Sequence, residues 1–260
     1  MAADIERLAH EFKGNKFKSV RDTLMTLASQ VRALGGPETF AVETQVTQPQ
    51  VADIKPSIAP QPVALEIPTV SEELYNKTRE ALRKEGFTHV VTIEPVSMGQ
   101  LATNEATGNR FWYVNSSESM RAVTPPQMEI AIDPKNVKIK NSNSKSTDTQ
   151  LRITAEEEAK LKGELPEDVR DLVSMPMHDP STLSQADFDY QDKTGKPLYP
   201  DFWLRTNVET VSGRVAYVGR NVPSHRLNVD DWSRDYVVDR IFAGRAVVLP
   251  RKLNVEQPAQ

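Results

Sequence analysis

The side chains best suited to acid–base chemistry are two histidines in the second half of the chain, His178 and His225. An imidazole titrates near neutral pH and can serve as a general base when a carboxylate lies beside it. Asp179 adjoins His178, and Asp231 follows a few residues after His225. No two of the four histidines have the i, i+4 spacing of a helical metal site. A catalytic role therefore depends on contacts that only folding can supply.

Three aspartates, Asp231, Asp235 and Asp239, recur at intervals of four residues. The apolar spacing around them predicts a helix over residues 229–242, which would place all three carboxylates on one face. Such a face could hold Mg²⁺ for phosphoryl chemistry. The interpretation that we favour is a solvated acidic stripe paired with neighbouring arginines.

A second acidic group, Asp187, Asp189 and Asp192, shares the composition of a calcium-binding loop. Its spacing differs, because the third acid comes one residue late and a leucine stands where the bidentate glutamate belongs. We favour a structural β-hairpin that turns over residues 192–195, with Gly195 at positive φ. The three aspartates are thus the candidate metal ligands, and we expect no metal there.

Several familiar motifs are absent from the sequence, including the nucleotide-binding glycine loops, the nucleophile elbow and the zinc-protease motif. The chain has no cysteine, which excludes thiolate catalysis and cysteine-ligated metals.

Arg110 precedes three aromatic residues, as in a base-stacking platform for nucleic acid. Strand aromatics more often pack as core or cross-strand pairs, which we favour. Because the sequence has none of the familiar cofactor-binding motifs, we expect no cofactor.

The elements that must position these residues follow from capping residues and periodicity. Ser71, with acids in the turn after it and Gly86 as a stop, predicts a helix over residues 71–85. Further helices are expected at residues 96–104, 154–163 and 166–173. Strands are expected at residues 87–93, 110–114, 128–132, 137–139, 151–153 and 246–249, with a hairpin over 202–219.

Helices and strands alternate irregularly along this part of the chain, and residues 128–153 have the spacing of an antiparallel meander. We therefore predict an α+β fold, with a mixed, mainly antiparallel sheet and several helices. This domain is expected to span residues 71–255.

Upstream of the domain, five apolar residues repeat at alternating intervals of four and three: Val20, Leu24, Leu27, Val31 and Leu34. This spacing predicts a helical arm over residues 1–36, with the seam of a short coiled coil of about two heptads. The seam must be buried, either against the chain's own domain or against another chain.

Residues 37–70 contain six prolines, which predict an extended linker rather than a helix. Aliphatic residues recur through this linker, where a flexible tether would carry glycine and serine. An extended segment lying along a surface and a disordered linker are both consistent with this composition.

Net charge and hydropathy exclude few classes of function. The net charge of -4 is too small to indicate a partner, and the apolar runs are too short for a membrane helix. The first residues carry acids and no apolar stretch of the kind that a secretory signal needs. We expect a cytoplasmic protein without a membrane partner.

These observations favour a non-enzymatic assembly or interaction protein, which associates with itself or with another protein through its arm and linker. One alternative is a metal-dependent or His/Asp hydrolase acting on nucleic acid or phosphoesters. A second alternative is a nucleic-acid-binding module without catalysis.

Overall fold

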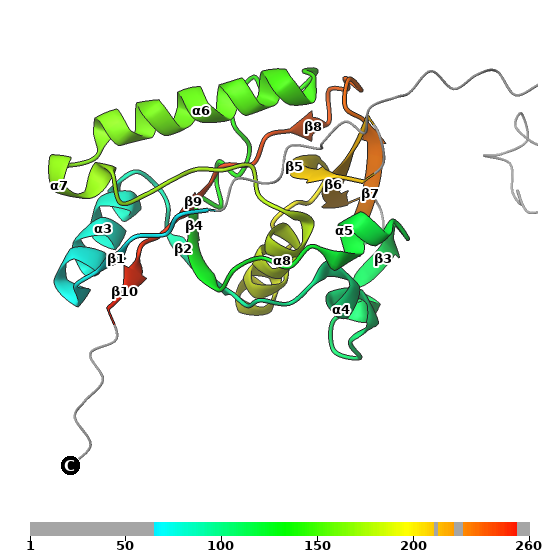
Figure 1. Cartoon of the computed structure of the whole chain (residues 1–260), viewed down its shortest axis with the longest axis horizontal. Coiled ribbons are helices and arrows are strands. Elements are labelled where there is room, and N and C mark those ends of the chain that lie inside the picture. The colour runs from blue at the N-terminus through cyan, green and yellow to red at the C-terminus, as the bar shows by residue number, and fades with distance from the viewer. Residues whose placement is uncertain (1–64, 211–212, 221–225, 254–260) are drawn as a thin grey trace, which may run out of the picture. The chain divides into compact units, whose positions relative to one another are not determined.

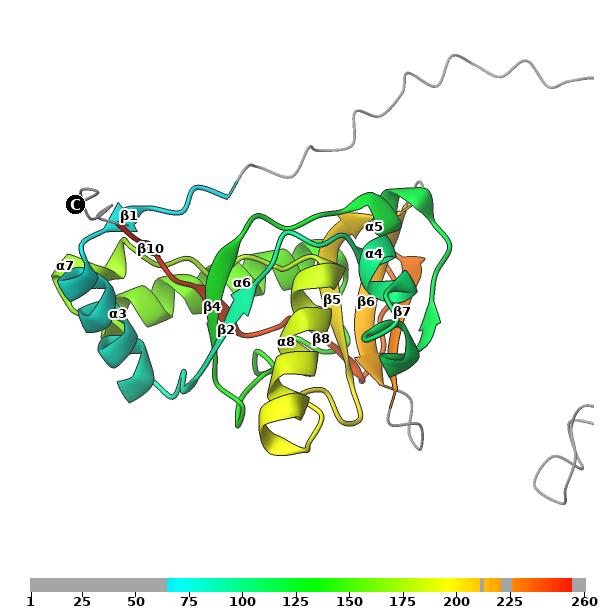
Figure 2. The same cartoon turned by 90° about the horizontal axis from the view of Figure 1, so that it is seen from below.

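The computed structural model describes residues 65–210, 213–220 and 226–253, and Figures 1 and 2 show their arrangement from two sides. The helical arm predicted for residues 1–36 lies outside the described residues, as does the predicted linker up to residue 64.

The described end of the predicted linker is part of the folded unit. Leu65 and Ile67 pack against the main hydrophobic core, the buried cluster that includes Ile93, Ile130 and Leu204. The chain then enters the short strand β1 (Thr69–Val70), which pairs in parallel with β10 (Arg251–Lys252). The fold therefore begins before Ser71.

The largest sheet has five strands in the order β3-β7-β6-β5-β8. Its three central strands are antiparallel neighbours, whereas β3 and β8 pair in parallel at the two edges. The strands are β3 (Phe111–Val114), β5 (Trp203–Glu209), β6 (Arg214–Arg220), β7 (Leu227–Ser233) and β8 (Ile241–Phe242). The β5–β6 hairpin confirms the prediction for this region, and Gly213 has the positive φ, 75°, that its turn requires.

A second, fully antiparallel sheet has the order β2-β4-β9. Its strands β2 (His89–Ile93), β4 (Met128–Ile132) and β9 (Ala246–Val248) lie where the sequence predicts strands. Because the described sheets are mixed but mostly antiparallel, the structure confirms the predicted α+β class.

The helices α3 (Glu72–Lys84) and α4 (Met98–Thr103) also confirm their predictions. Ser71 caps α3 by accepting a hydrogen bond from the amide of Leu74. The other helical segments are η2 (Gly108–Arg110), α5 (Glu118–Ala122), α6 (Thr147–Glu164), α7 (Glu167–Arg170) and α8 (Pro180–Thr194).

Helix α8 lies between the two larger sheets, as Figure 2 shows. Its Leu183, Ala186 and Phe188 are buried in the main core with side chains from β2 and β6. Figure 1 shows α6 running along another side of the molecule, where half of its residues are exposed. The central position of α8 explains why it buries polar as well as apolar side chains.

Four predictions of local structure are wrong. Residues 187–195 form the end of α8 rather than a hairpin, although Gly195 does have positive φ, 70°, as the residue that ends the helix. Residues 151–153 belong to α6 instead of a strand. Residues 137–139 make only one isolated bridge, from Lys138 to Gly244.

The fourth wrong prediction concerns the helix expected over residues 229–242. The first half of this segment, residues 229–235, is the end of strand β7 and the turn after it. Trp232 of β7 packs against the rings of Tyr217 on the adjacent strand β6 and Trp203 on β5, the next strand along. Trp232 is therefore partly buried by cross-strand packing. The apolar residues of this segment happen to have helical spacing, which is why the sequence predicts a helix.

Candidate functional site

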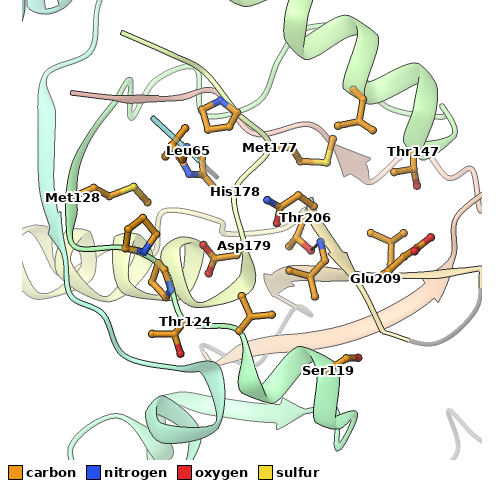
Figure 3. Close-up of a pocket in the computed structure, with 18 of the residues that line it drawn as sticks. Leu65, Ser119, Thr124, Met128, Thr147, Met177, His178, Asp179, Thr206 and Glu209 are labelled. Carbon is orange, nitrogen blue, oxygen red and sulfur yellow. Dashed lines mark hydrogen bonds between the residues drawn. The ribbon is translucent and has the colours of Figure 1, made fainter. Parts of the chain in front are cut away.

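A cavity of about 730 Å³ lies beside the N-terminal end of α8, and Figure 3 shows the side chains around it. Its walls come from segments far apart in the sequence: the chain before β1, α5 and the loop after it, the start of β4, the start of α6, the loop before α8, and β5, β6 and the turn after β7. The volume falls within the range of about 300–1,000 Å³ that is usual for ligand sites.

Most of the wall is apolar. The apolar lining residues are Leu65, Val123, Pro125, Pro126, Met128, Leu151, Pro176, Met177, Val208 and Val215. Met128 and Met177 are both nearly inaccessible to solvent, so they form the floor rather than the rim. Methionine side chains adapt their shape to what they contact, which suits a wall that binds an apolar group.

His178 is the buried titratable residue of the cavity. Its Nε2 atom lies 3.2 Å from the carbonyl oxygen of Ala246. Because a carbonyl only accepts hydrogen bonds, Nε2 carries the proton and Nδ1 is left as an acceptor. Burial lowers the pKa of His178, although the Ala246 carbonyl and the charge of Asp179 oppose this shift. The ring is therefore neutral at pH 7.

Asp179 also lines the cavity, but its carboxylate is occupied by α8. It accepts hydrogen bonds from the amide of Thr182 at 2.9 Å and from the hydroxyl of Thr182 at 2.6 Å. These contacts make Asp179 the N-cap of the helix, with Pro180 in the first turn. The structure thus places His178 and Asp179 in one cavity without a hydrogen bond between their side chains.

The charged rim of the cavity is paired. Arg234 contacts Glu209 at 3.1 Å and also bonds Asp148 at the start of α6. The hydrogen bond to Asp148 is the main cause that raises the pKa of Arg234. An incoming anion would have to compete with these two carboxylates.

The hydroxyl groups of the cavity are likewise engaged with the chain itself. Ser119 donates to the carbonyl oxygen of Thr210 at 2.6 Å, and Thr206 donates to that of Ala216 at 2.9 Å. Figure 3 shows Ser119 well away from His178. The described residues of the cavity therefore contain no hydrogen-bonded chain of nucleophile, base and acid of the kind that Ser-His-Asp hydrolases use.

Behind this wall lies Arg205, a buried arginine that the sequence does not reveal. Its guanidinium donates to the Thr147 hydroxyl at 2.5 Å, to the carbonyl oxygen of Arg234 at 2.9 Å and to that of Tyr236 at 2.7 Å. Burial lowers the pKa of Arg205. Its position in a strand next to a threonine gives no sequence signal for this role.

The aspartates predicted to share a helix face do not do so. Asp231 is buried on β7, where it accepts hydrogen bonds from Thr210 and from Arg214, the latter at 2.8 Å. Asp235 lies in the turn after β7, and neither aspartate lines the cavity of His178. His225 lies outside the described residues. The predicted carboxylate face is thus absent because its helix does not form.

The three aspartates of the second acidic group each contact different residues. Asp187 forms a buried ion pair with Arg220, while Asp189 contacts Lys193 at 2.8 Å and lies 3.1 Å from the ring of His89. Asp192 pairs with Arg110 at 2.9 Å on the surface. No cluster of three metal-ligating side chains occurs among the residues that the structure describes.

The aromatic run on β3 is partly exposed. Trp112 and Tyr113 face solvent, whereas Phe111 packs against Phe188 of α8. Arg110 bonds the backbone of Phe188 and the side chains of α8 rather than projecting beside the exposed rings. The arginine expected in a base-stacking platform is therefore already engaged.

Within the described parts of the chain, no helix has the length and apolar character needed to cross a bilayer. The predicted interaction seam of the N-terminal arm lies outside those parts. Comparison with known protein families, curated proteins and solved structures finds no match to this chain in any of the three.

Proposed function

We propose that this chain is a non-enzymatic interaction protein that associates through its N-terminal arm. The observation that carries the non-enzymatic part is the state of the cavity. Its acid–base and hydroxyl groups serve the fold, as His178, Asp179 and Ser119 illustrate, whereas its apolar wall is left to contact an apolar segment. This arrangement supports binding by shape and apolar contact rather than bond cleavage.

The proposed association surface is the seam Val20, Leu24, Leu27, Val31 and Leu34. The heptad-like spacing supports this surface, because a narrow apolar stripe on a helix is typically buried by packing against another helix. Another copy of the chain supplies the matching stripe.

The test is the double variant Leu24→Asp with Leu27→Asp in the full chain, followed by sedimentation velocity and a thermal melt. Each charge buried without a partner costs several kcal/mol, so we expect the oligomer to dissociate while the melting temperature of the α+β domain stays unchanged. The matched control, Thr26→Asp with Ser29→Asp, adds the same charge off the seam and should leave the oligomer intact.

A lower melting temperature with unchanged particle size would mean that the arm packs on its own domain, which contradicts the proposal. Equal effects of the seam and control variants would contradict it as well, because the effect would then come from charge alone.

A hydrolase that uses His178 is the second candidate, and the neutral ring with Nδ1 as an acceptor is the observation in its favour. A screen of p-nitrophenyl phosphate and ester substrates tests it, with His178→Gln as the matched variant. Turnover by the parent chain that is lost in this variant would favour the hydrolase over the interaction protein.

A further inference from the structure

The described chain begins at the cavity. Leu65 is half-buried, lines the cavity and packs against the main core. From there the backbone continues past Ile67 to β1, which is fixed by its pairing with β10. Whatever precedes Leu65 is therefore covalently held at the cavity.

The preceding residues have the chemistry of the cavity wall. Residues 56–64 read PSIAPQPVA and contain no charged side chain, with Ile58 and Val63 as the larger apolar groups. Pro60 and Pro62 have no backbone N–H, so fewer hydrogen-bond donors would be left unpaired when this segment is buried. Each proline ring also restricts its own backbone φ, so a proline-containing peptide loses less conformational entropy on binding.

The cavity complements such a segment. Its lining is mainly apolar, and the rim charges of Arg234 and Glu209 are paired with each other. Nδ1 of His178 offers one hydrogen-bond acceptor. A charged peptide would gain no free counter-charge from these groups.

We propose that residues 58–63 of the same chain occupy the cavity. The length of the tether favours the chain's own segment over that of a second copy, because Val63 lies two residues from Leu65 and can move at most about 7 Å from it. A short tether of this kind gives an effective concentration in the millimolar range. The cavity then binds the last part of the linker. This assignment goes beyond the proposed association, which concerns the arm alone.

The absence of cysteine from the chain allows a direct test by engineered disulfides in the full-length protein. Val208→Cys places one thiol in the cavity wall, and a second cysteine replaces each of residues 58 to 63 in turn. We expect a disulfide within one chain for at least one position under mild oxidation, because the bond forms only when the Cα atoms approach to about 4.4–6.8 Å. Mobility on non-reducing gels and the mass of the linked peptides identify the bond.

The matched control replaces Gln127, an exposed residue between the lining residues Pro126 and Met128, by cysteine. We expect each linker cysteine to react faster with Cys at position 208 than at position 127. A Val123→Cys series gives a second lining position in case Val208→Cys lowers the melting temperature.

Three results would overturn the assignment: a disulfide that joins two chains, which would make a second copy the occupant; equal rates at the lining and control positions; or no disulfide in either lining series. Sedimentation of the arm variants described above reports on the proposed function separately, so failure of one does not imply failure of the other.

Discussion

Helices α8 and α6 are each attached to the five-stranded sheet by a buried arginine, but the two attachments differ in how the charge is compensated. Arg220 of β6 meets the carboxylate of Asp187 in α8. Arg205 of β5 meets the hydroxyl of Thr147 in α6 and two backbone carbonyls. The first attachment is an ion pair, whereas the second depends on neutral acceptors.

The difference follows from the position of each helix. Asp187 lies in the middle of α8 between two sheets, where it also accepts hydrogen bonds from the amides of Leu198 at 2.9 Å and Tyr199 at 3.4 Å. Burial raises the pKa of Asp187 and lowers that of Arg220, and their mutual attraction opposes both shifts. Removing one member leaves the other charge buried, so we expect the α8 attachment to be the less tolerant of change.

The largest expected effect is that of Asp187→Asn, which leaves Arg220 charged and buried. We expect the free energy of unfolding to fall by about 3–5 kcal/mol in urea denaturation. The control is Asp192→Asn on the same helix, where the side chain of the pair with Arg110 is 68% exposed and should matter by at most about 1 kcal/mol. Similar losses for both variants would remove the distinction between buried and exposed pairs.

A smaller loss of stability is expected for Arg205→Leu, which tests the attachment of α6. This variant leaves the carbonyl oxygen of Tyr236 without its donor, whereas the Thr147 hydroxyl keeps its hydrogen bond to the carbonyl oxygen of Arg234. It also removes a buried charge, so we expect a loss of about 1–3 kcal/mol. Arg234→Gln, at the partly exposed rim, should cost less than about 1 kcal/mol. If Arg205→Leu destabilised the protein more than Asp187→Asn, the neutral attachment would be the stronger one.

The pH dependence of the free energy of unfolding should come mainly from His178, next to α8. Burial lowers the pKa of His178, directly before α8, from its usual 6.5. Below pH 6.5 the unfolded chain therefore binds a proton that the folded chain does not, and the free energy of unfolding should fall by at most about 1.4 kcal/mol per pH unit. This loss ends once the pH drops below the folded pKa.

Urea denaturation between pH 7.5 and 5 measures this slope. His178→Gln should reduce it more than His89→Gln, since His89 is only partly buried, although burial lowers its pKa too. An unchanged slope in His178→Gln would show that other groups account for the pH dependence.

The smallest effects concern one glycine at the end of each helix. Gly195 follows α8 with φ of 70°, so alanine there should cost about 1 kcal/mol although space for its Cβ is open. Gly163 lies in the last turn of α6 with no atom near an added Cβ, so alanine should stabilise by up to about 1 kcal/mol. Thermal melts measure the two changes in melting temperature, which should have opposite signs. A change of the same sign in both variants would contradict this account.

The parts of the fold that the sequence predicts are those fixed by local chemistry. Ser71 and Gly86 delimit α3, Gly213 marks the β5–β6 turn, and period-two alternation identifies β4. These signals lie within a few residues of the element that they define.

The incorrect predictions arise where tertiary contacts override the local pattern. Leu151 and Ile153 suit a strand, yet Ser146 caps a helix that starts earlier and is held by the buried Gln150, which donates to the carbonyl oxygens of Ser142 and Ile241. Helix α8 was open to prediction, because Asp179 before Pro180 is a recognisable N-cap.

The cavity itself could not be predicted from the sequence. Of the candidate catalytic residues within the described chain, only His178 and Asp179 line it. The other walls come from segments as distant as Leu65 and Arg234, which share no motif and meet only through the sheet topology.

The parallel pairing of β1 with β10 has a mechanical consequence. Arg251 donates its amide to the carbonyl oxygen of Pro68, and Leu253 donates to that of Val70, both at 2.8 Å. Because the strands run in the same direction, the chain enters β1 at one end of the pair and leaves β10 at the other. Tension between these two points shears both hydrogen bonds at once instead of opening them one after the other. The junction therefore resists pulling along the chain more strongly than two antiparallel strands of the same length would.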